Sequence, residues 1–123
     1  MESKSATLSL SALGHDGRLA IFRLLVSAGP TGLAAGEIAR RLGMVPNSLS
    51  ANLNILSRAN LTTSRREGRS IIYQADFSTM TALVGFLVGD CCGGATEICA
   101  PLNQLLSQAQ QCAPTPSRQK ELC

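Results

Sequence analysis

The chain has 123 residues and a hydrophobic content of 45%, which suits one domain with a modest core. Aromatic residues make up only 3%, so the core must be aliphatic, and base stacking on aromatic rings is excluded as a main binding mode. The net charge of +3 is unevenly distributed. Residues 1–70 hold 9 Lys or Arg against 4 Asp or Glu, whereas residues 71–123 hold 2 against 4. This basic first half favours nucleic acid as a partner.

The sequence carries no evident secretory or membrane segment. It starts with Met-Glu-Ser-Lys-Ser and has no basic flank followed by a long apolar run. Its most apolar window, residues 80–88, is far too short to cross a bilayer. We therefore expect a cytoplasmic protein with no membrane partner.

Two segments precede the central motif. Residues 6–13 contain three leucines, and their spacing fits either a short helix or a strand. Asp16 is predicted to cap a helix over residues 17–28, where apolar residues recur at i, i+3, i+4 and i+7. The Gly-Pro-Thr-Gly of residues 29–32 predicts a turn.

The stretch around residues 37–58 predicts two short helices joined by a tight turn. In the first helix the apolar residues form one stripe, and Gly43 can adopt the left-handed conformation that often ends a helix. The second helix begins near Pro46, which a first turn tolerates because its missing N–H has no helical partner there. The inward stripe of this helix is Leu49, Leu53 and Leu56.

The outward face of the second helix is short, uncharged and rich in hydrogen-bonding groups. These properties suit a helix that lies against base edges in the major groove. An ordinary helical hairpin would also present a polar surface to solvent, because exposed faces are usually polar. The residues on this face are Asn47, Ser48, Ser50, Ala51, Asn52 and Asn54.

A predicted β-hairpin follows the helix pair. Two β-prone runs, residues 61–66 and 70–75, flank a short loop at residues 67–69. Arginines at this loop can reach phosphates or a minor groove, although they also suit a hairpin whose charges only keep a sheet edge soluble. A helix pair followed by a basic hairpin is typical of a winged helix-turn-helix. The arginines on the loop and its shoulders are Arg65, Arg66 and Arg69.

Residues 77–89 predict a helix that is apolar nearly all round and contains no charged residue. Such a helix is normally buried, and in so small a chain its second face is expected to pack against another copy. Gly85 and Gly89 would let two helices approach closely, or would only weaken the end of the helix. A homodimer also suits DNA, since paired reading helices match palindromic half-sites.

The five cysteines favour metal or redox chemistry over a disulfide framework, since we expect a cytoplasmic chain. Cys91, Cys92 and Cys99, called the cysteine cluster below, flank a Gly-Gly pair. A continuous helix would hold Cys92 and Cys99 roughly 10 Å apart, so a break at the glycines is needed for the sulfurs to converge. Three thiolates without a nearby His favour trivalent arsenic or antimony over zinc, which usually takes four ligands. Packing of small apolar thiols is the alternative.

The remaining residues complete the expected organisation. Cys112 and Cys123 lie in or near a loose tail that starts at residue 113, either as spare ligands or as incidental thiols. Residues 102–109 predict one more short helix. We therefore expect residues 1–100 to form a DNA-binding and dimerisation domain with the cysteine site, and residues 101–123 to form a short helix and a flexible tail.

Several short motifs follow one another in an order that resembles a known family. They are Ala-Leu-Gly-His-Asp-Gly-Arg-Leu-Ala-Ile at residues 12–21, Leu-Gly at residues 42–43, Asn-Ser-Leu-Ser at residues 47–50 with Leu53 and Leu56, and Arg-Arg-Glu-Gly-Arg at residues 65–69 before Tyr73. Over residues 11–76, more than half of the chain, this pattern resembles the ArsR/SmtB family of winged-helix metalloregulators. The resemblance implies a homodimeric repressor that is built through its first and last helices and leaves its operator when a metal binds.

The metal sites of this family differ between subgroups. One arsenic site uses Cys-x-Cys in the first helix of the helix-turn-helix, where this chain has Ala34 and Gly36. The zinc site on the last helix needs His and acidic ligands, which residues 77–89 lack, so no zinc is expected. The cysteine cluster resembles a third, arsenic-responsive subgroup with a vicinal cysteine pair after the last helix. The family often places a basic residue or His where this chain has Ala51 and Asn52, so its operators cannot be transferred.

These observations predict a mainly α, homodimeric winged helix-turn-helix repressor that trivalent arsenic or antimony releases from double-stranded DNA through three thiolates. Trivalent methylated arsenicals bound by Cys91 and Cys92 alone, or thiol oxidation, are the alternatives. We expect no enzyme, because the sequence has no Cys-x-x-Cys, no base beyond His15 and no cofactor loop. The expected DNA contacts are Asn47, Ser48, Ser50 and Asn52 in the major groove and Arg65, Arg66 and Arg69 on the backbone.

Overall fold

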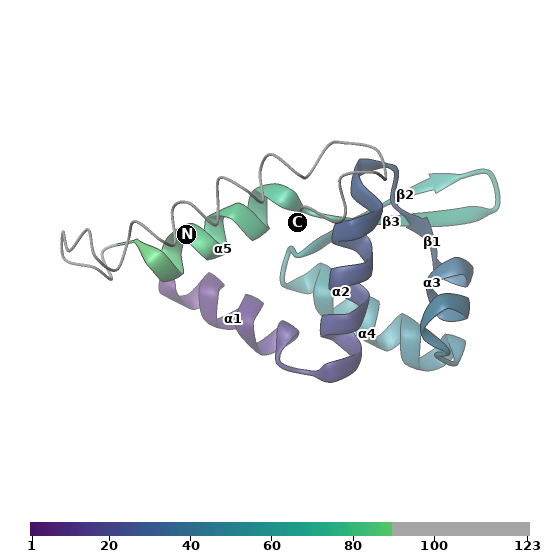
Figure 1. Cartoon of the computed structure of the whole chain (residues 1–123), viewed down its shortest axis with the longest axis horizontal. Coiled ribbons are helices and arrows are strands. Elements are labelled where there is room, and N and C mark those ends of the chain that lie inside the picture. Colours follow the sequence, from purple (N-terminus) through teal and green to yellow (C-terminus); the bar gives the residue numbers. More distant parts are fainter. Residues whose placement is uncertain (90–123) are drawn as a thin grey trace, which may run out of the picture. The chain divides into compact units, whose positions relative to one another are not determined.

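The fold is mainly helical with a β-hairpin wing, as the sequence predicts, and the hairpin is part of a three-stranded antiparallel sheet (Figure 1). The structure, a computed structural model, describes residues 1–89. They comprise a compact unit over Met1–Leu83 and the start of a second unit at Val84. The elements are α1 (Ser3–Leu13), α2 (Asp16–Ala28), the 3₁₀ helix η1 (Gly29–Thr31), β1 (Leu33–Ala34), α3 (Ala35–Leu42), α4 (Pro46–Arg58), β2 (Thr62–Glu67), β3 (Ser70–Ala75) and α5 (Phe77–Val88).

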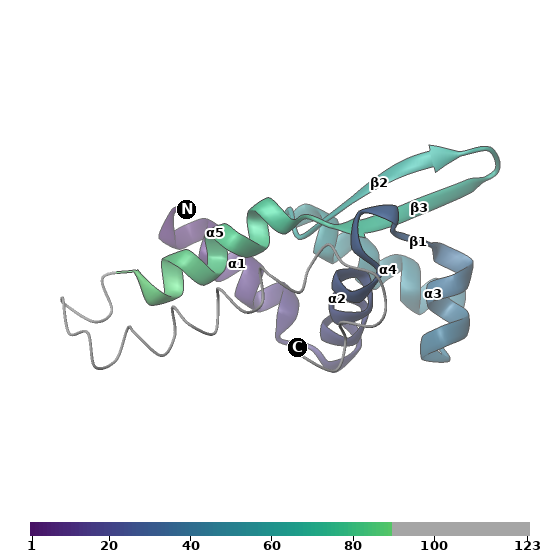
Figure 2. The same ribbon diagram turned by 45° about the horizontal axis from the view of Figure 1, so that its top comes forward.

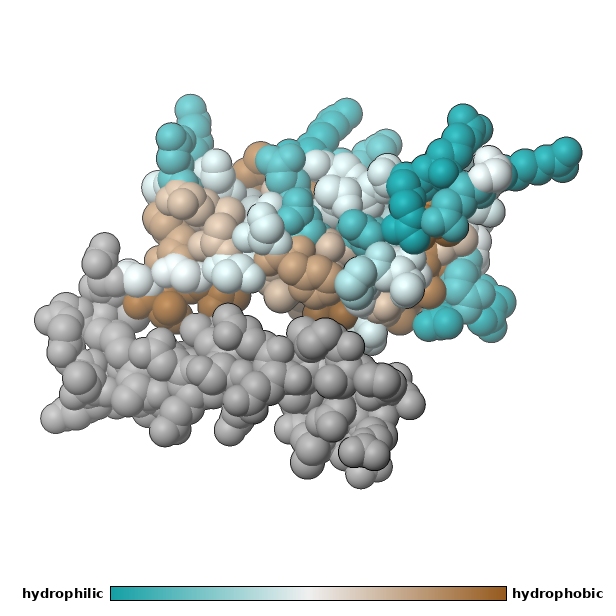
Figure 3. Space-filling model, turned by 90° about the horizontal axis from the view of Figure 1, so that it is seen from above, coloured by the Kyte–Doolittle hydropathy of each residue, from teal (hydrophilic) through white to brown (hydrophobic). Residues whose placement is uncertain are grey.

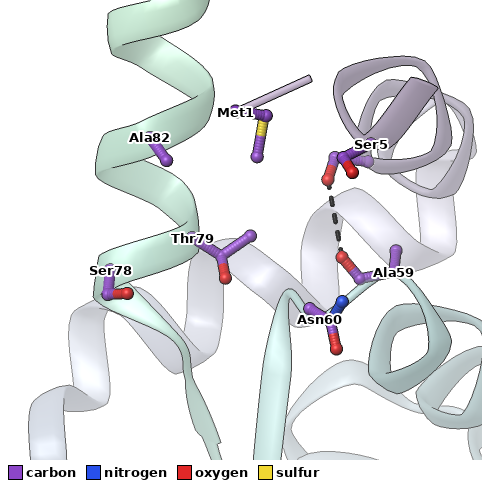
Figure 4. Close-up of a pocket in the computed structure, with 8 residues that line it drawn as sticks. Met1, Ser5, Ala59, Asn60, Ser78, Thr79 and Ala82 are labelled. Atoms are coloured by element: carbon purple, nitrogen blue, oxygen red, sulfur yellow. Dashed lines mark hydrogen bonds between the residues drawn. The ribbon is translucent and has the colours of Figure 1, made fainter. Parts of the chain in front are cut away.

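The first leucine-rich segment is a helix, α1, and the strand alternative is wrong. Its buried face consists of the small residues Ala6, Ser9 and Ala12, which let the helix approach the rest of the unit closely. The Ser9 hydroxyl donates a hydrogen bond to the Ala59 carbonyl oxygen at 3.5 Å. Beside this contact an open hollow of about 230 Å³ lies between α1, the end of α4 and the first turns of α5 (Figure 4).

The helix α2 begins at Asp16, but its cap is His15, so the prediction that Asp16 caps the helix is wrong. His15 has the extended backbone of a capping residue, and its Nδ1 accepts the N–H groups of Gly17 and Arg18 at 3.1 and 3.4 Å. The imidazole nitrogen therefore does what a capping carboxylate or hydroxyl usually does. Asp16 lies in the first turn, where a negative charge favours the helix dipole.

The core is mainly aliphatic, as the composition predicts, although it also contains the aromatic Phe22, and it is shared by α2, α3 and α4. The predicted inward stripe of α4 is confirmed, since Leu49, Leu53 and Leu56 are all buried. Burial of a side chain of this size contributes on the order of 1.5–3 kcal/mol, so the stripe fixes the rotation of α4 about its axis. The core residues that contact this stripe or extend it include Ile21, Phe22, Leu25, Ile38 and Leu61.

The turn between α3 and α4 forms as its sequence predicts. The helix α3 ends at Gly43, which adopts the left-handed conformation with φ +63°. Pro46 is the first residue of α4, and Val45 is its N-cap. At the other end of α4, Asn60 has φ +61°, and the Leu61 N–H donates a hydrogen bond to the Leu56 carbonyl oxygen at 3.0 Å.

The sheet has the order β1-β3-β2, and its two-residue strand β1 was not predicted. Leu33 pairs with Tyr73, and Ala34 pairs with Ile72. Gly32 makes this pairing possible, because it has φ +68° and a Cβ at this position would collide with the Tyr73 carbonyl oxygen. The strand β1 therefore ties the helix pair to the base of the hairpin.

The hairpin of β2 and β3 extends away from the helices and forms the predicted wing (Figure 2). Only Thr62 is buried in β2, and the remaining residues of that strand are exposed. Glu67 pairs with Ser70, so the connecting turn is Gly68-Arg69 and is one residue shorter than the predicted loop. Gly68 has φ +62°, as tight hairpin turns favour.

The last described helix, α5, matches the predicted helix to within one residue. Asp76 caps it, since its Oδ1 accepts the Thr79 N–H at 3.1 Å. Leu83 is its buried residue, whereas Phe86 and Leu87 are exposed. The helices within residues 1–89 are all too short or too polar to span a bilayer. The cysteine cluster, the predicted helix at residues 102–109 and the tail lie outside the described residues.

Candidate nucleic-acid interface

The polar face of α4 is presented to solvent because the opposite face is buried. Asn47, Ser48 and Ser50 are exposed, as are Ala51 and Asn54. Within residues 1–89, the side chains of Asn47, Ser48 and Ser50 have no hydrogen-bond partner, so their amide and hydroxyl groups are available to a ligand. Amides and hydroxyls are the groups that read base edges or bind phosphates in DNA complexes.

Asn52 differs from the other predicted contacts because it lies at the edge of this face and is half-buried. Its Oδ1 accepts a hydrogen bond from Arg18 Nη1 at 3.4 Å. Arg18 also donates from Nε to the Ala12 carbonyl oxygen at 2.6 Å. A guanidinium can only donate, so Asn52 must direct its oxygen towards Arg18 and is left with its NH₂ as the free group.

Arg18 therefore links the end of α1 and the start of α2 to the reading helix. Arg18 was not predicted as a site residue. Its place in the first turn of α2 follows from the sequence, but Asn52 becomes its neighbour only through tertiary packing.

The three wing arginines are not equivalent. Arg65 donates hydrogen bonds to Glu67 Oε2 at 2.7 Å, to Gln74 Oε1 at 2.9 Å and to the Thr31 carbonyl oxygen at 2.7 Å. These partners lie on β2, on β3 and on the turn after α2, respectively. Through the bond to Thr31, Arg65 braces the wing against the helical part of the unit, and each of its three side-chain nitrogens already donates one hydrogen bond without DNA.

Arg66 and Arg69 are the available cations of the wing. Neighbouring residues of a strand point to opposite faces, so Arg66 faces away from the side on which Arg65 is held. Arg69 lies in the turn. Both are exposed, and neither makes a hydrogen bond or ion pair within the described part of the chain. Long hydrophilic side chains project from the end of the molecule that carries the wing (Figure 3).

A compact charge cluster lies on α3. Glu37, in the first turn, accepts hydrogen bonds from Arg40 and from Arg41, whose Nε lies 2.6 Å from Glu37 Oε2. The hydrogen bond from Arg40, followed by that from Arg41, lowers the pKa of Glu37 from 4.5 to about 2. The carboxylate also partly neutralises both arginines, so they add less to the positive field than their number indicates.

The described residues offer no metal site. No group of three or more His, Cys, Asp or Glu side chains comes together within residues 1–89. His15 uses one ring nitrogen as the cap of α2. The predicted ligands Cys91, Cys92 and Cys99 fall outside these residues.

Comparison with known proteins finds similarity over the part of the chain that holds the helix pair. A family profile described as a helix-turn-helix domain matches residues 13–65, from the end of α1 into β2. The nodulation protein NolR of Rhizobium meliloti is 31% identical over 78 residues, which are 63% of this chain. The match spans 62% of that relative's length.

Solved structures are similar to this chain in both sequence and fold. The crystal structure of NolR from Sinorhizobium fredii is 30% identical, covers 71% of this chain and 87% of its own, and has a TM-score of 0.57. A homodimeric winged helix-turn-helix DNA-binding domain from Mycobacterium bovis, described as a possible ArsR-family regulator, is 29% identical with a TM-score of 0.58. It covers 71% of this chain and 81% of its own.

The chain belongs to the ArsR/SmtB family of winged-helix regulators. The fold that the resemblance implied is therefore confirmed, including the order of helix pair and wing. In this ArsR/SmtB chain the exposed face of α4 and the free arginines of the wing belong to one compact unit.

The ion cluster on α3 of this ArsR/SmtB chain predicts a pH-dependent contribution to stability. Because the pKa of Glu37 is lower in the folded state, its contribution is complete above pH 4.5 and is lost as the pH falls towards 2. Glu37→Gln should therefore lower the thermal midpoint at pH 6, and the difference from wild type should shrink between pH 4.5 and 2. The difference should be small and salt-sensitive, since the cluster is solvent-exposed.

The matched control is Glu2→Gln, which removes the same charge from an exposed position before α1. A difference between Glu37→Gln and wild type that stays constant from pH 6 to pH 2 would contradict the assignment. Thermal unfolding followed by circular dichroism measures both variants.

Proposed function

We propose that this protein is a sequence-specific, DNA-binding transcriptional repressor that acts as a homodimer. The observation that carries the proposal is the exposed, uncharged polar face of α4 beside a wing with two unpaired arginines. Each part alone suits other functions, but a reading helix next to a basic hairpin matches the two kinds of group that duplex DNA presents. Since the chain spans 62% of the curated NolR relative, this activity is inferred from the site rather than transferred.

The two parts of the site have different tasks. Asn47, Ser48 and Ser50 on α4 lie against base edges in the major groove, with the NH₂ of Asn52 at the edge of the contact. Arg66 and Arg69 bind phosphates beside the same groove, which fixes the register of the helix without reading sequence. Arg65 positions the wing through its bonds to Thr31, Glu67 and Gln74.

Exposed apolar side chains support the homodimer. On α1, whose inward residues are small, Leu8 and Leu10 are exposed. On α5, Phe86 and Leu87 are exposed. Solvent exposure of such side chains on two short helices favours burial against a second copy. Pairing through the first and last helices would present two reading helices to palindromic half-sites.

The inducer in this proposal is trivalent arsenic or antimony, bound by Cys91, Cys92 and Cys99. Arsenite, As(OH)₃, reacts with three cysteine thiols: each As–O bond is replaced by an As–S bond, and each thiol proton leaves with a hydroxyl group as water. A set of three sulfurs therefore matches its valence. Soft thiolates favour such an ion over hard cations, and the missing fourth ligand disfavours structural zinc. No organic cofactor is required. The Gly-Gly pair between the second and third sulfurs allows the chain to fold back around the ion.

Release from DNA requires that the inducer bind the DNA-free form more tightly than the DNA-bound form. A coupling free energy of about 1–3 kcal/mol between the two sites is typical and corresponds to a change in DNA affinity of about 5- to 150-fold. The cysteine cluster follows α5 directly in the sequence. Ordering of that segment by the ion would therefore act on the helix that the proposal places in the dimer.

The division of labour between the wing arginines is testable by salt titration. Arg66→Ala and Arg69→Ala should each lower the slope of log K against log salt by about 2, because each removes one phosphate contact per half-site and therefore two per bound dimer. Arg65→Ala should leave that slope nearly unchanged but lower the thermal midpoint, because it removes the brace of the wing. Fluorescence anisotropy with a DNA duplex measures the slopes.

The control for this series is Arg23→Ala, an exposed arginine on α2 outside the helix pair and the wing. It should change neither the slope nor the affinity. If Arg66→Ala and Arg69→Ala behave like Arg23→Ala, the wing does not contact DNA.

The inducer is tested by adding arsenite to the DNA complex under reducing conditions. Wild type should be released, whereas Cys91→Ser, Cys92→Ser and Cys99→Ser should each remain bound, since each loses one of three ligands. Cys112→Ser and Cys123→Ser serve as matched controls and should respond like wild type. Release of Cys99→Ser would leave a two-sulfur site and favour a methylated arsenical. If arsenite has no effect on wild type but peroxide does, the protein senses thiol oxidation.

A further inference from the structure

Val45 is the most exposed large hydrophobic residue of the described chain. The residue is 65% exposed, whereas the other exposed large hydrophobic residues lie between 39% and 52%. It directly precedes Pro46 at the start of α4 and is followed by the exposed residues Asn47 and Ser48. An isolated exposed valine is ordinary on a protein surface, so only its position at the start of the reading helix indicates a functional contact.

Val45 occupies a position for which its side chain is poorly suited. It is the N-cap of α4, where Ser, Thr, Asp or Asn would accept an N–H from the first turn and stabilise the helix. A valine cannot do so, and α4 has no side-chain cap. Since Pro46 has no N–H, the N–H groups of Asn47 and Ser48 are left without a partner within the described residues. The helices α1 and α3 also lack a side-chain cap, so what distinguishes Val45 is its exposed apolar side chain at the start of the reading helix.

The local backbone holds the Val45 side chain in one direction. Val45 has φ −73° and ψ 146°, the extended conformation that a following proline imposes. The β-branched side chain also has few rotamers, so little conformational entropy is lost when a ligand covers it. The two γ-methyl groups are thus presented as a fixed apolar surface at the leading end of the reading helix.

The major groove contains one apolar group that fits such a surface. The leading residues of a recognition helix contact base edges, and the 5-methyl group of thymine is the apolar feature that distinguishes these edges. We propose that Val45 packs against the 5-methyl group of a thymine in each half-site and thereby determines part of the sequence preference. This inference rests on the proposed DNA-binding function.

The experiment starts with the full-length protein under reducing conditions and a pool of random-sequence duplexes. Enrichment of a defined sequence is required by the proposed function, and failure to enrich any sequence would overturn that function. Each thymine of the enriched half-site is then replaced singly by deoxyuridine, which lacks only the 5-methyl group. One replacement should weaken wild-type binding about fourfold per half-site.

Substitutions of Val45 test whether this residue makes the contact with the thymine methyl group. Val45→Ala should bind the thymine site more weakly than wild type and respond little to the deoxyuridine replacement. Val45→Ser should lose the same discrimination yet unfold about 3–6 °C higher, because serine caps α4. Opposite changes in stability and discrimination cannot arise from a purely structural role. Leu19→Ala, at an exposed leucine of α2, should retain full discrimination.

The inference is overturned if no thymine of an enriched sequence depends on its methyl group. It is also overturned if Val45→Ala discriminates thymine from uracil as well as wild type does. In both cases the enrichment itself shows that DNA binding stands without the contact.

Discussion

Packing of the leucine stripe of α4 against α2 and α3 is the constraint on which the structure depends. With Leu49, Leu53 and Leu56 buried, α4 has one allowed rotation, and Asn47, Ser48 and Ser50 must face solvent. Truncating one of these leucines to alanine would lower the free energy of unfolding by about 2–5 kcal/mol and would leave the rotation of α4 about its axis less well fixed. The reading surface is therefore a consequence of the core, and its chemistry can vary while the core stays the same.

The wing depends on a second set of contacts that are polar rather than apolar. A two-stranded hairpin is only marginally stable alone, and β2 is almost wholly exposed. Pairing of β1 with β3 and the hydrogen bond from Arg65 to the Thr31 carbonyl oxygen attach the hairpin to the helical part of the unit, while the bonds of Arg65 to Glu67 and Gln74 lie within the hairpin. Arg66 and Arg69 remain available for phosphates. Adjacent arginines in the sequence thus carry different tasks because strand geometry sends their side chains to opposite faces.

Local signals in the sequence predicted most of the fold, and the contacts that were missed have tertiary causes. The wrong cap of α2 is a local error, because the ring nitrogen of His15 takes the place expected for the carboxylate of Asp16. The stripe of α4, Gly43 and Pro46 act within a few residues, so periodicity and backbone preference were sufficient. The two-residue strand β1 has no pattern of its own and exists only through its pairing with β3. The brace at Arg65 joins residues 34 positions apart, and so does the contact between Arg18 and Asn52. Neither contact can be predicted from residues that are close together in the sequence. The cysteine cluster stays a prediction from sequence.

The central claim is that α4 and the wing bind duplex DNA, and amide hydrogen exchange tests it most directly. In the free protein the N–H groups of Asn47 and Ser48 lack partners and should exchange rapidly, as should the wing turn at Gly68 and Arg69. Binding of an enriched duplex is predicted to slow exchange at both places and to leave the middle of α2 unchanged. Protection confined to α1 or α2, with the first turn of α4 and the wing still exchanging rapidly, would contradict the account.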